Sequence, residues 1–157
     1  MAVSLQLATT LNWINGEWRH SGVEGESINP ATSEKIGRYA QGGVVEADDA
    51  IAAAVRAFRD EDWRDNRNLR ARVLNLMADR FEAKSEELAR LITIENGKTL
   101  EQARFEIGIV PLTLRFNAAL ALTDQGHNAR IETGHLSIVM REPVGVAGII
   151  APWNSPA

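Results

Sequence analysis

Apolar and polar positions change their period along the chain, and each change predicts a different kind of element. Over residues 12–43, short apolar pairs are separated by the turn sequences Asn15-Gly16 and Asn29-Pro30-Ala31-Thr32, which favours short antiparallel strands. Over residues 46–122, apolar residues return every three or four positions, as on one face of a helix. Over residues 129–142 they alternate with other residues, which is typical of a strand.

The helical region is expected to hold three or four helices, in three segments. Their predicted apolar positions are Ile51, Val55 and Phe58 in the first, Leu69, Val73, Met77, Phe81, Leu88, Leu91 and Ile92 in the second, and Ala103, Ile107, Leu114, Ala118 and Leu122 in the third. Asp48 and Asp49 lie near the expected start of the first helix, where negative charge suits the helix dipole. Asn96-Gly97 predicts the end of the second, and Pro111 predicts a kink or a split in the third.

The end of the chain is expected to enter a sheet. Gly134 suits a bend beside the alternating strand, and Pro143 separates that strand from an apolar run over residues 144–151. Such a run is typical of a parallel strand that is covered on both faces. A parallel strand needs a crossover connection to reach its partner, and none follows in this sequence. We therefore expect the chain to be incomplete as a fold.

Composition narrows the class of protein. The chain has 157 residues, of which 45% are hydrophobic and 24% charged, as in an ordinary soluble domain. Its net charge of −4 argues against nucleic acid or an anionic membrane surface as the main partner. The first residues have no basic segment of the kind that opens a signal peptide, and no stretch approaches a membrane span. The expectation is a cytoplasmic protein without a nucleic-acid or membrane partner.

Residue types also limit the chemistry. The chain has no cysteine, so it offers no disulfide, no thiolate metal ligand and no thiol nucleophile. His20, His127 and His135 are scattered without the spacing of metal ligands, so no metal site is predicted. Gly145 and Gly148 do not form the glycine pattern of a dinucleotide-binding turn.

Six short motifs nevertheless occur in the same order as in a known protein family. They are Ile14-Asn15-Gly16-Glu17-Trp18, Ile28-Asn29-Pro30-Ala31-Thr32, Ala50-Ile51-Ala52-Ala53-Ala54, Glu95-Asn96-Gly97-Lys98-Thr99, Arg141-Glu142-Pro143-Val144-Gly145-Val146 and Ile150-Ala151-Pro152-Trp153-Asn154. With these motifs the chain resembles the N-terminal part of the NAD(P)-dependent aldehyde dehydrogenase superfamily. The last motif is the most specific. The resemblance implies an α/β fold with short antiparallel strands, several helices, an oligomerisation-type strand and the first strand of an incomplete Rossmann-like parallel sheet.

The same resemblance implies a division of the chain. Residues 1–128 would be the N-terminal part of the cofactor-binding domain, mostly helical after residue 45. Residues 129–142 would be a β segment of the oligomerisation type, and the strand over residues 130–142 would join subunits into a homo-oligomer. Residues 143–157 would hold the first strand and the Pro-Trp-Asn turn of a truncated Rossmann-like core.

Roles for individual residues follow by position. The residues that would border NAD or NADP are Ile150, Ala151, Pro152 and Trp153. Asn154 would donate its side-chain amide to the carbonyl oxygen of the aldehyde. Negative charge develops on that oxygen during attack by a thiolate, and losing one such donor typically costs about 10²–10³ in rate. Ser155 stands where the family usually has an aromatic residue, so the resemblance does not predict the local packing there.

The family's cysteine nucleophile, glutamate base and pyrophosphate-binding turn would lie beyond residue 157. We therefore expect this chain alone to be catalytically inactive. In the complete protein an aldehyde would be oxidised to an acid through a thiohemiacetal, hydride transfer and thioester hydrolysis. The alternative is a naturally short, non-catalytic helical module that pairs with a relative through the strand over 130–142. Glu95 is interpreted as a solvated charge rather than a cation ligand, and Lys98 as a helix-end cation without a catalytic role.

Overall fold

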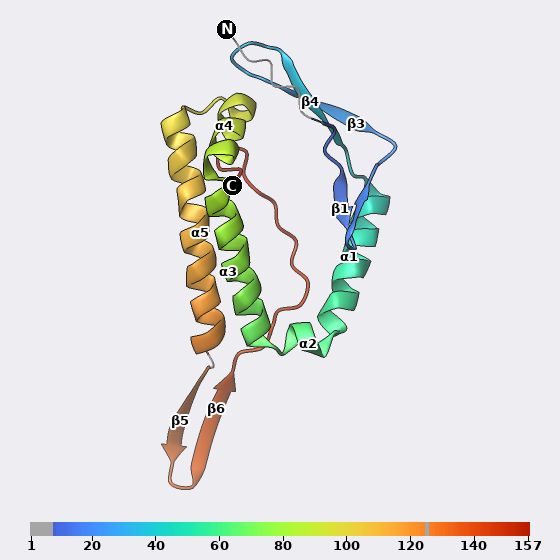
Figure 1. Cartoon of the computed structure of the whole chain (residues 1–157). Helices are drawn as coiled ribbons and strands as arrows, with labels where there is room; N and C mark the ends of the chain where they lie inside the picture. Colours follow the sequence, from blue (N-terminus) through green and yellow to red (C-terminus); the bar gives the residue numbers. More distant parts are fainter. Residues whose placement is uncertain (1–7, 125) are drawn as a thin grey trace.

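The computed structural model describes residues 8–124 and 126–157, and Figure 1 shows their arrangement. The strands are β1 (Asn12–Ile14), β2 (Glu17–Arg19), β3 (Glu24–Ile28), β4 (Lys35–Ala40), β5 (Gly126–Glu132) and β6 (His135–Met140). The helices are α1 (Val44–Arg59), α2 (Glu61–Arg64), α3 (Arg67–Ala83), α4 (Ser85–Asn96) and α5 (Leu100–Thr123). Three antiparallel hairpins thus flank a group of helices, and residues 141–157 run without helix or strand between the two sides of the molecule (Figure 1).

The two N-terminal hairpins confirm the predicted turns. Asn15 and Gly16 both have positive φ, 53° and 82°, as a tight two-residue hairpin turn requires. Across this hairpin Trp13 pairs with Trp18, and their ring centroids lie 4.7 Å apart. Between β3 and β4, the side chain of Asn29 accepts the backbone N–H two residues later at 2.9 Å, which is how asparagine initiates a turn.

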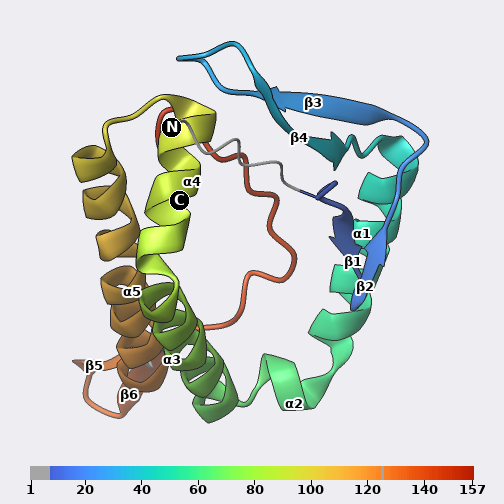
Figure 2. The same cartoon turned by 45° about the horizontal axis from the view of Figure 1, so that its top comes forward.

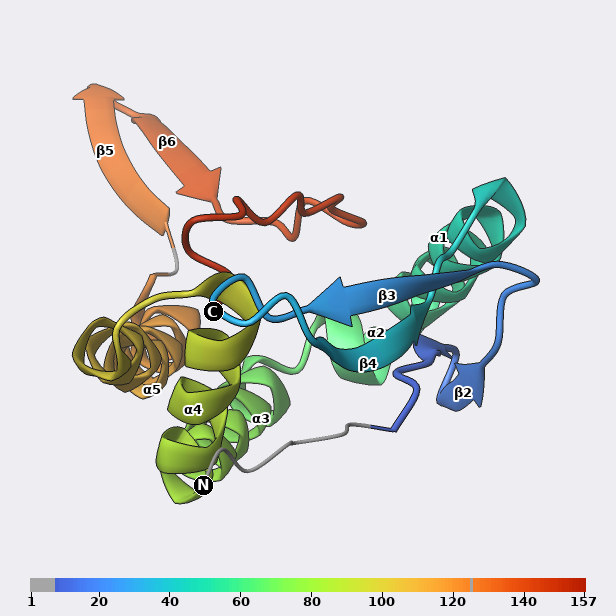
Figure 3. The same cartoon turned by 90° about the horizontal axis from the view of Figure 1, so that it is seen from above.

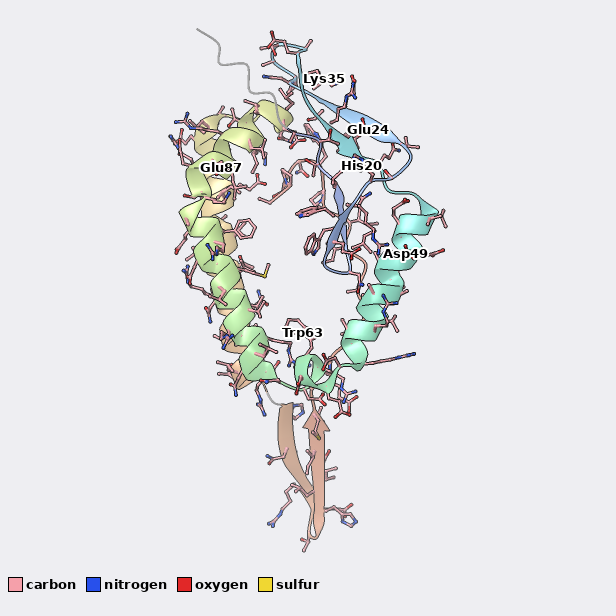
Figure 4. The ribbon with its side chains drawn as sticks, turned by 45° about the vertical axis from the view of Figure 1, so that its right-hand side comes forward. His20, Glu24, Lys35, Asp49, Trp63 and Glu87 are labelled. Atoms are coloured by element: carbon pink, nitrogen blue, oxygen red, sulfur yellow. The ribbon has the colours of Figure 1, made fainter. Side chains whose placement is uncertain are left out.

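Helix α1 lies beside the first hairpin. Arg19 of β2 donates to Asp49 of α1 at 3.0 Å, and Figure 4 shows Asp49 on the flank of α1 near these strands. The helix begins at Val44, two residues before the predicted start, because the Glu46 carboxylate accepts the N–H of Gly43 at 2.7 Å. The capping acid is therefore Glu46, and Asp49 lies beyond the first turn.

Helices α3, α4 and α5 form the packed layer of the molecule. Figure 3 shows them together, away from α1. The buried residues that these helices share are mostly alanines, namely Ala71, Ala78, Ala89, Ala103 and Ala118, together with Ile107. Small side chains at a helix contact let the two backbones approach closely. The packing of this layer therefore depends on close approach rather than on large apolar side chains.

A kink or a split was predicted at Pro111, and the split does not occur, because helix α5 runs unbroken from Leu100 to Thr123. Pro111 lies in the buried face of the helix, where packing against the neighbouring helices outweighs the loss of one backbone hydrogen bond. The predicted apolar face is right at Ala103 and Ile107. Leu122, near the helix end, is instead 40% exposed.

By length and composition, α5 is the one helix in the described ranges that could cross a membrane. Both faces of α5 are apolar, because Phe105, Leu112 and Phe116 form an exposed stripe opposite the buried face. It also carries Glu106 and Arg115, both in ion pairs, and ion-paired charges are costly inside a bilayer. A single such helix is weak evidence for a membrane protein.

The strand predicted over residues 144–151 is not formed. Val144, Ile149 and Ile150 are 96%, 89% and 97% exposed. A strand needs hydrogen-bonding neighbours, and no other strand of the described chain lies against this segment. The total surface is 12118 Å², against about 7,800 Å² for a compact chain of this mass. Figures 1 and 2 show the segment passing between the α3–α5 layer and α1, where it stays uncovered.

The β5–β6 hairpin projects beyond the end of the helical layer (Figure 1). It confirms the alternating strand and the bend at Gly134, which has a positive φ of 86°. Strand β5 begins at Gly126, three residues before the expected β segment at 129. Ile131, Leu136 and Met140 are 64% to 73% exposed. The oligomerisation role of this hairpin and the three-part division of the chain stay predictions.

Candidate functional site

Two motifs that are far apart in the sequence meet at the end of α4. Gly97 ends the helix with a left-handed φ of 83°, as predicted for Asn96-Gly97. A side chain at Gly97 would start 2.9 Å from Cγ of Pro30, so the glycine also permits contact with the β3–β4 turn. Beside it, Ser27 donates to the Glu95 carboxylate at 3.0 Å. Glu95, expected to be solvated, thus ties α4 to β3.

The Pro-Trp-Asn motif joins the same place. The side-chain amide of Asn96 donates to the carbonyl oxygen of Trp153 at 2.9 Å. A turn follows, in which the N–H of Ser155 donates to the carbonyl oxygen of Pro152 at 3.3 Å. The side chain of Asn154 is exposed and makes no hydrogen bond to the described part of the chain. Its amide is therefore held on an anchored turn and is available to a ligand.

A groove of about 740 Å³ lies beneath this turn, and we refer to it as the interior groove. Its apolar floor is formed by Phe81, Leu88, Leu91 and Ile92. The predicted cofactor residues 151–153 form part of its wall, whereas Ile150 is 97% exposed and does not line it. The structure thus brings three of the four predicted cofactor residues together. Their cofactor role stays a prediction.

An ion pair holds the chain end on the other side of the turn. Lys98 pairs with the Glu106 carboxylate, and their side chains are 20% and 11% exposed. The second oxygen of Glu106 accepts the N–H of Ala157 at 3.0 Å. Burial alone would raise the pKa of Glu106, but Lys98 and the Ala157 N–H together hold it below its ordinary value. Glu106 is therefore an ionised anchor.

Little in the sequence indicates this ion pair. Lys98 precedes α5 and Glu106 lies inside it, so the two residues do not share the three- or four-residue spacing of helical partners. The contact of Asn96 with Trp153 is not predicted either, because Asn96-Gly97 indicates only a helix end. Its place in one of the family motifs was the available sign of a longer-range contact.

A second hollow, of about 530 Å³, lies on the outer side of α5, and we refer to it as the outer hollow. The residues that line it are Lys98, Glu101, Gln102, Phe105, Glu106, Ile109 and Ser155. Residues 151–153 line the interior groove, whereas Ser155 lines the outer hollow. Pro156 and Ala157, which follow Ser155, line the interior groove again, and Asn154 is part of neither lining.

This arrangement can stabilise negative charge on an oxygen but cannot form a covalent intermediate with a thiol. The Asn154 amide is a neutral donor, and a preorganised neutral donor suits an oxyanion that forms during reaction. The sequence contains no cysteine. A thiolate that attacked a substrate at this amide would have to come from outside residues 1–157.

Comparisons with known proteins agree with this picture. The model of the aldehyde dehydrogenase family matches residues 18–157. Betaine aldehyde dehydrogenase of Bacillus subtilis is 36% identical over 149 residues, which is 92% of this chain and 30% of that protein. The solved NAD-dependent aldehyde dehydrogenase from Sinorhizobium meliloti superposes with a TM-score of 0.88 at 30% identity, over 97% of this chain and 31% of that one.

A third relative is a double mutant of betaine aldehyde dehydrogenase from Staphylococcus aureus, solved in complex with NAD+. It has a TM-score of 0.86 at 32% identity, over 94% of this chain and 30% of that one. The chain thus spans about a third of the length of the relatives that it matches. These likenesses confirm the predicted fold class, including its N-terminal place in the fold. The chain belongs to the aldehyde dehydrogenase family.

Proposed function

We propose that this chain is the N-terminal part of an NAD(P)-dependent aldehyde dehydrogenase, which oxidises an aldehyde to a carboxylic acid. The observation that carries the proposal is the unpaired amide of Asn154 on a turn that Asn96 anchors. The interior groove supports it, since residues of the same turn form part of its wall.

Asn154 is the proposed oxyanion donor. An oxygen that gains charge as its carbonyl is attacked would accept a hydrogen bond from this amide, and the anchored turn limits the reorganisation needed at that moment. The Asn96–Trp153 bond fixes the turn from the α4 side, and the Glu106–Ala157 bond fixes it from the α5 side. Asn96 and Glu106 are therefore positioning residues.

Residues 150–153 are the proposed border of the cofactor, NAD or NADP, which supplies the hydride acceptor when bound. The flat apolar surfaces of Pro152 and Trp153 suit a cofactor ring, and Trp153 is 77% exposed. A solved relative in complex with NAD+ supports the cofactor type. Ile150 belongs to this border only if the strand over 144–151 forms, because here it is 97% exposed and does not line the groove.

The chain by itself is proposed to be inactive, since it contains no thiol nucleophile. The exposed β5–β6 hairpin is the proposed contact of a homo-oligomer. Its apolar side chains Leu136, Ile138 and Met140 are 64% to 73% exposed, and exposed apolar patches often mark protein contacts. A cytoplasmic location is proposed together with these properties.

The test begins with the DNA that follows the codon for Ala157. An open frame that encodes a cysteine and a later glutamate supports the proposal, and the longer protein should form NADH or NADPH with an aldehyde. Asn154→Ala in that protein should lower kcat about 10²–10³-fold. Asn117→Ala, an exposed asparagine on α5, is the matched control and should leave kcat unchanged. A stop codon directly after Ala157, or aldehyde-dependent NADH formation by the 157-residue chain, would contradict the proposal.

A further inference from the structure

The dipeptide Asn-Gly occurs twice in the chain, at residues 15–16 and 96–97. It is chemically labile, because the backbone nitrogen of the glycine can attack the side-chain carbonyl carbon of the asparagine. Glycine leaves that nitrogen unshielded, since it has no side chain, and it also tolerates the backbone conformations that the attack needs. Because the dipeptide is the same, a large difference in reactivity between the two sites would come from their surroundings.

At the first site neither reacting group is held. Asn15 and Gly16 form the two-residue turn of the β1–β2 hairpin, and both are exposed. The side chain of Asn15 and the N–H of Gly16 make no hydrogen bond within the described part of the chain. A Cβ atom added at Gly16 would meet nothing within 4 Å, so the space around the nitrogen is open to water. This turn therefore leaves the dipeptide free to react.

At the second site both reacting groups are held by hydrogen bonds. The side-chain amide of Asn96 donates to the carbonyl oxygen of Trp153 at 2.9 Å, which fixes the direction of the amide. The N–H of Gly97 donates to the carbonyl oxygen of Thr93 at 3.0 Å, in the last turn of α4. The attack requires this nitrogen to lose its proton and to turn towards the asparagine side chain. Both hydrogen bonds must therefore open before the reaction.

We propose that Asn15 is a site of spontaneous deamidation and that the terminal segment protects Asn96 from the same reaction. The nitrogen of Gly16 bonds to Cγ of Asn15 and gives up its proton, and the side-chain nitrogen leaves as ammonia. Water then opens the resulting cyclic imide at either carbonyl group, which yields aspartate or isoaspartate. One water is consumed and one ammonia is released, so the reaction needs no cofactor. It is independent of the proposed dehydrogenase function.

The product changes the shape of the hairpin as well as its charge. Isoaspartate carries the backbone through the former side chain, so the two-residue turn becomes longer by one carbon atom. Positive φ at Asn15 and Gly16, 53° and 82°, closes such a turn only at its normal length. The Trp13–Trp18 pair, with ring centroids 4.7 Å apart, comes directly after the pair that closes the turn. These rings should separate, and circular dichroism of the paired rings should decrease.

The test is incubation of the 157-residue chain at mildly alkaline pH, followed by digestion and peptide mass spectrometry. The two asparagines are measured in the same sample, and labelling by isoaspartyl methyltransferase identifies the isoaspartate. Asn15 should deamidate about 30-fold faster than Asn96, the factor expected when two hydrogen bonds must open first. No deamidation of Asn15, or equal rates at the two sites, would overturn the proposal.

Two variants test the two halves of the proposal. Gly16→Ala shields the attacking nitrogen and should slow deamidation of Asn15 several-fold. Gly134→Ala, the same change at another turn glycine with positive φ and open space around it, is the matched control and should leave that rate unchanged.

Trp153→Gly keeps the carbonyl group that Asn96 binds but removes the side chain that lines the interior groove. It should speed deamidation of Asn96 about 2–5-fold, through the added backbone freedom of glycine, and leave Asn15 unchanged. An unchanged rate at Asn96 would refute protection by the terminal segment. An equal slowing of Asn15 in both glycine variants would refute the direct attack by Gly16.

Discussion

The α3–α5 layer and the terminal segment 141–157 are both apolar in sequence, yet they differ completely in burial. In the layer, Ala78, Ala89 and Ala103 are fully buried. In the segment, Ile149 and Ile150 are 89% and 97% exposed, although their side chains are larger. Apolar composition therefore does not decide burial by itself. What decides it is whether a partner of matching shape lies within the same stretch of chain.

The two regions are also held in different ways. The layer combines close packing with ion pairs at its rim, where Arg115 of α5 reaches Asp79 and Glu82 of α3. Near its end, the segment is held by two hydrogen bonds, from Asn96 to Trp153 and from Ala157 to Glu106. A segment that depends on a few polar contacts can open while the rest stays folded. Local opening at 151–157 is therefore expected at a lower free energy than global unfolding.

The largest expected effect comes from removing a packed side chain. Ile107→Ala should lower the free energy of unfolding by about 2–5 kcal/mol, because Ile107 is 2% exposed and the layer cannot close the gap. Ile150→Ala removes the same atoms from the terminal segment and should change it by less than about 0.5 kcal/mol. Urea denaturation followed by circular dichroism measures both. Equal losses would show that the segment is packed in solution.

A smaller effect is expected at the contact between α4 and the β3–β4 turn. Gly97→Ala should cost about 1–3 kcal/mol, because position 97 has φ of 83° and a methyl group would meet Pro30. Gly148→Ala in the terminal segment is the control, since nothing lies within 4 Å of the added atom there. The measurement is the urea midpoint of each variant. An unchanged midpoint for Gly97→Ala would mean that the contact between Gly97 and Pro30 does not exist in solution.

These differences show which parts of the molecule the sequence could predict. The Asn15-Gly16 turn and the helix end at Gly97 were predicted because both depend on the backbone preferences of one or two residues. The oxyanion candidate Asn154 came from a resemblance, and the structure adds its unpaired amide. The Lys98–Glu106 pair was not predicted, because it depends on how α5 follows α4 in space.

The prediction of a strand over residues 144–151 was wrong for a related reason. Its apolar run was interpreted correctly as a sequence that suits a buried strand, but strand formation also needs neighbours that residues 1–157 do not supply. Pro111 is the opposite case, in which the surrounding helices override a local signal. Local signals thus predicted turns and helix ends. Elements that depend on residues far away in the sequence could not be predicted from their own segment alone.

The next prediction concerns the anchor of the terminal segment. Asn96→Ala should release the Trp153 carbonyl, at a cost of about 1 kcal/mol for one hydrogen bond. Chymotrypsin cleavage after Trp153 should then become about 5-fold faster, which corresponds to the same free energy of local opening. The urea midpoint of the layer should stay unchanged. Asn117→Ala is the control, and an equal rise in cleavage there would refute a specific anchor.

The smallest effect is expected at the rim of the layer, as a change in acid stability. Hydrogen bonds from Arg104 and then Arg90 lower the pKa of Glu86 from 4.5 to about 2. A carboxylate with a lowered folded-state pKa stabilises the fold above its unfolded pKa, and this stability is lost as the pH falls. The contribution of Glu86 is therefore complete above pH 4.5 and disappears between pH 4.5 and about 2.

Glu86→Gln should accordingly lower the urea midpoint slightly at pH 7 and should not lower it at pH 2. The difference from the parent chain should shrink across the interval from pH 4.5 to about 2. The effect is small because the three side chains are exposed and solvent screens their charges. Glu87→Gln, one residue along and paired with Lys84 at 3.5 Å, is the control. A pH-independent loss in Glu86→Gln would mean that Glu86 acts through packing rather than charge. The polar contacts of Glu86 would then not stabilise the layer, in contrast to the hydrogen bonds that hold the terminal segment.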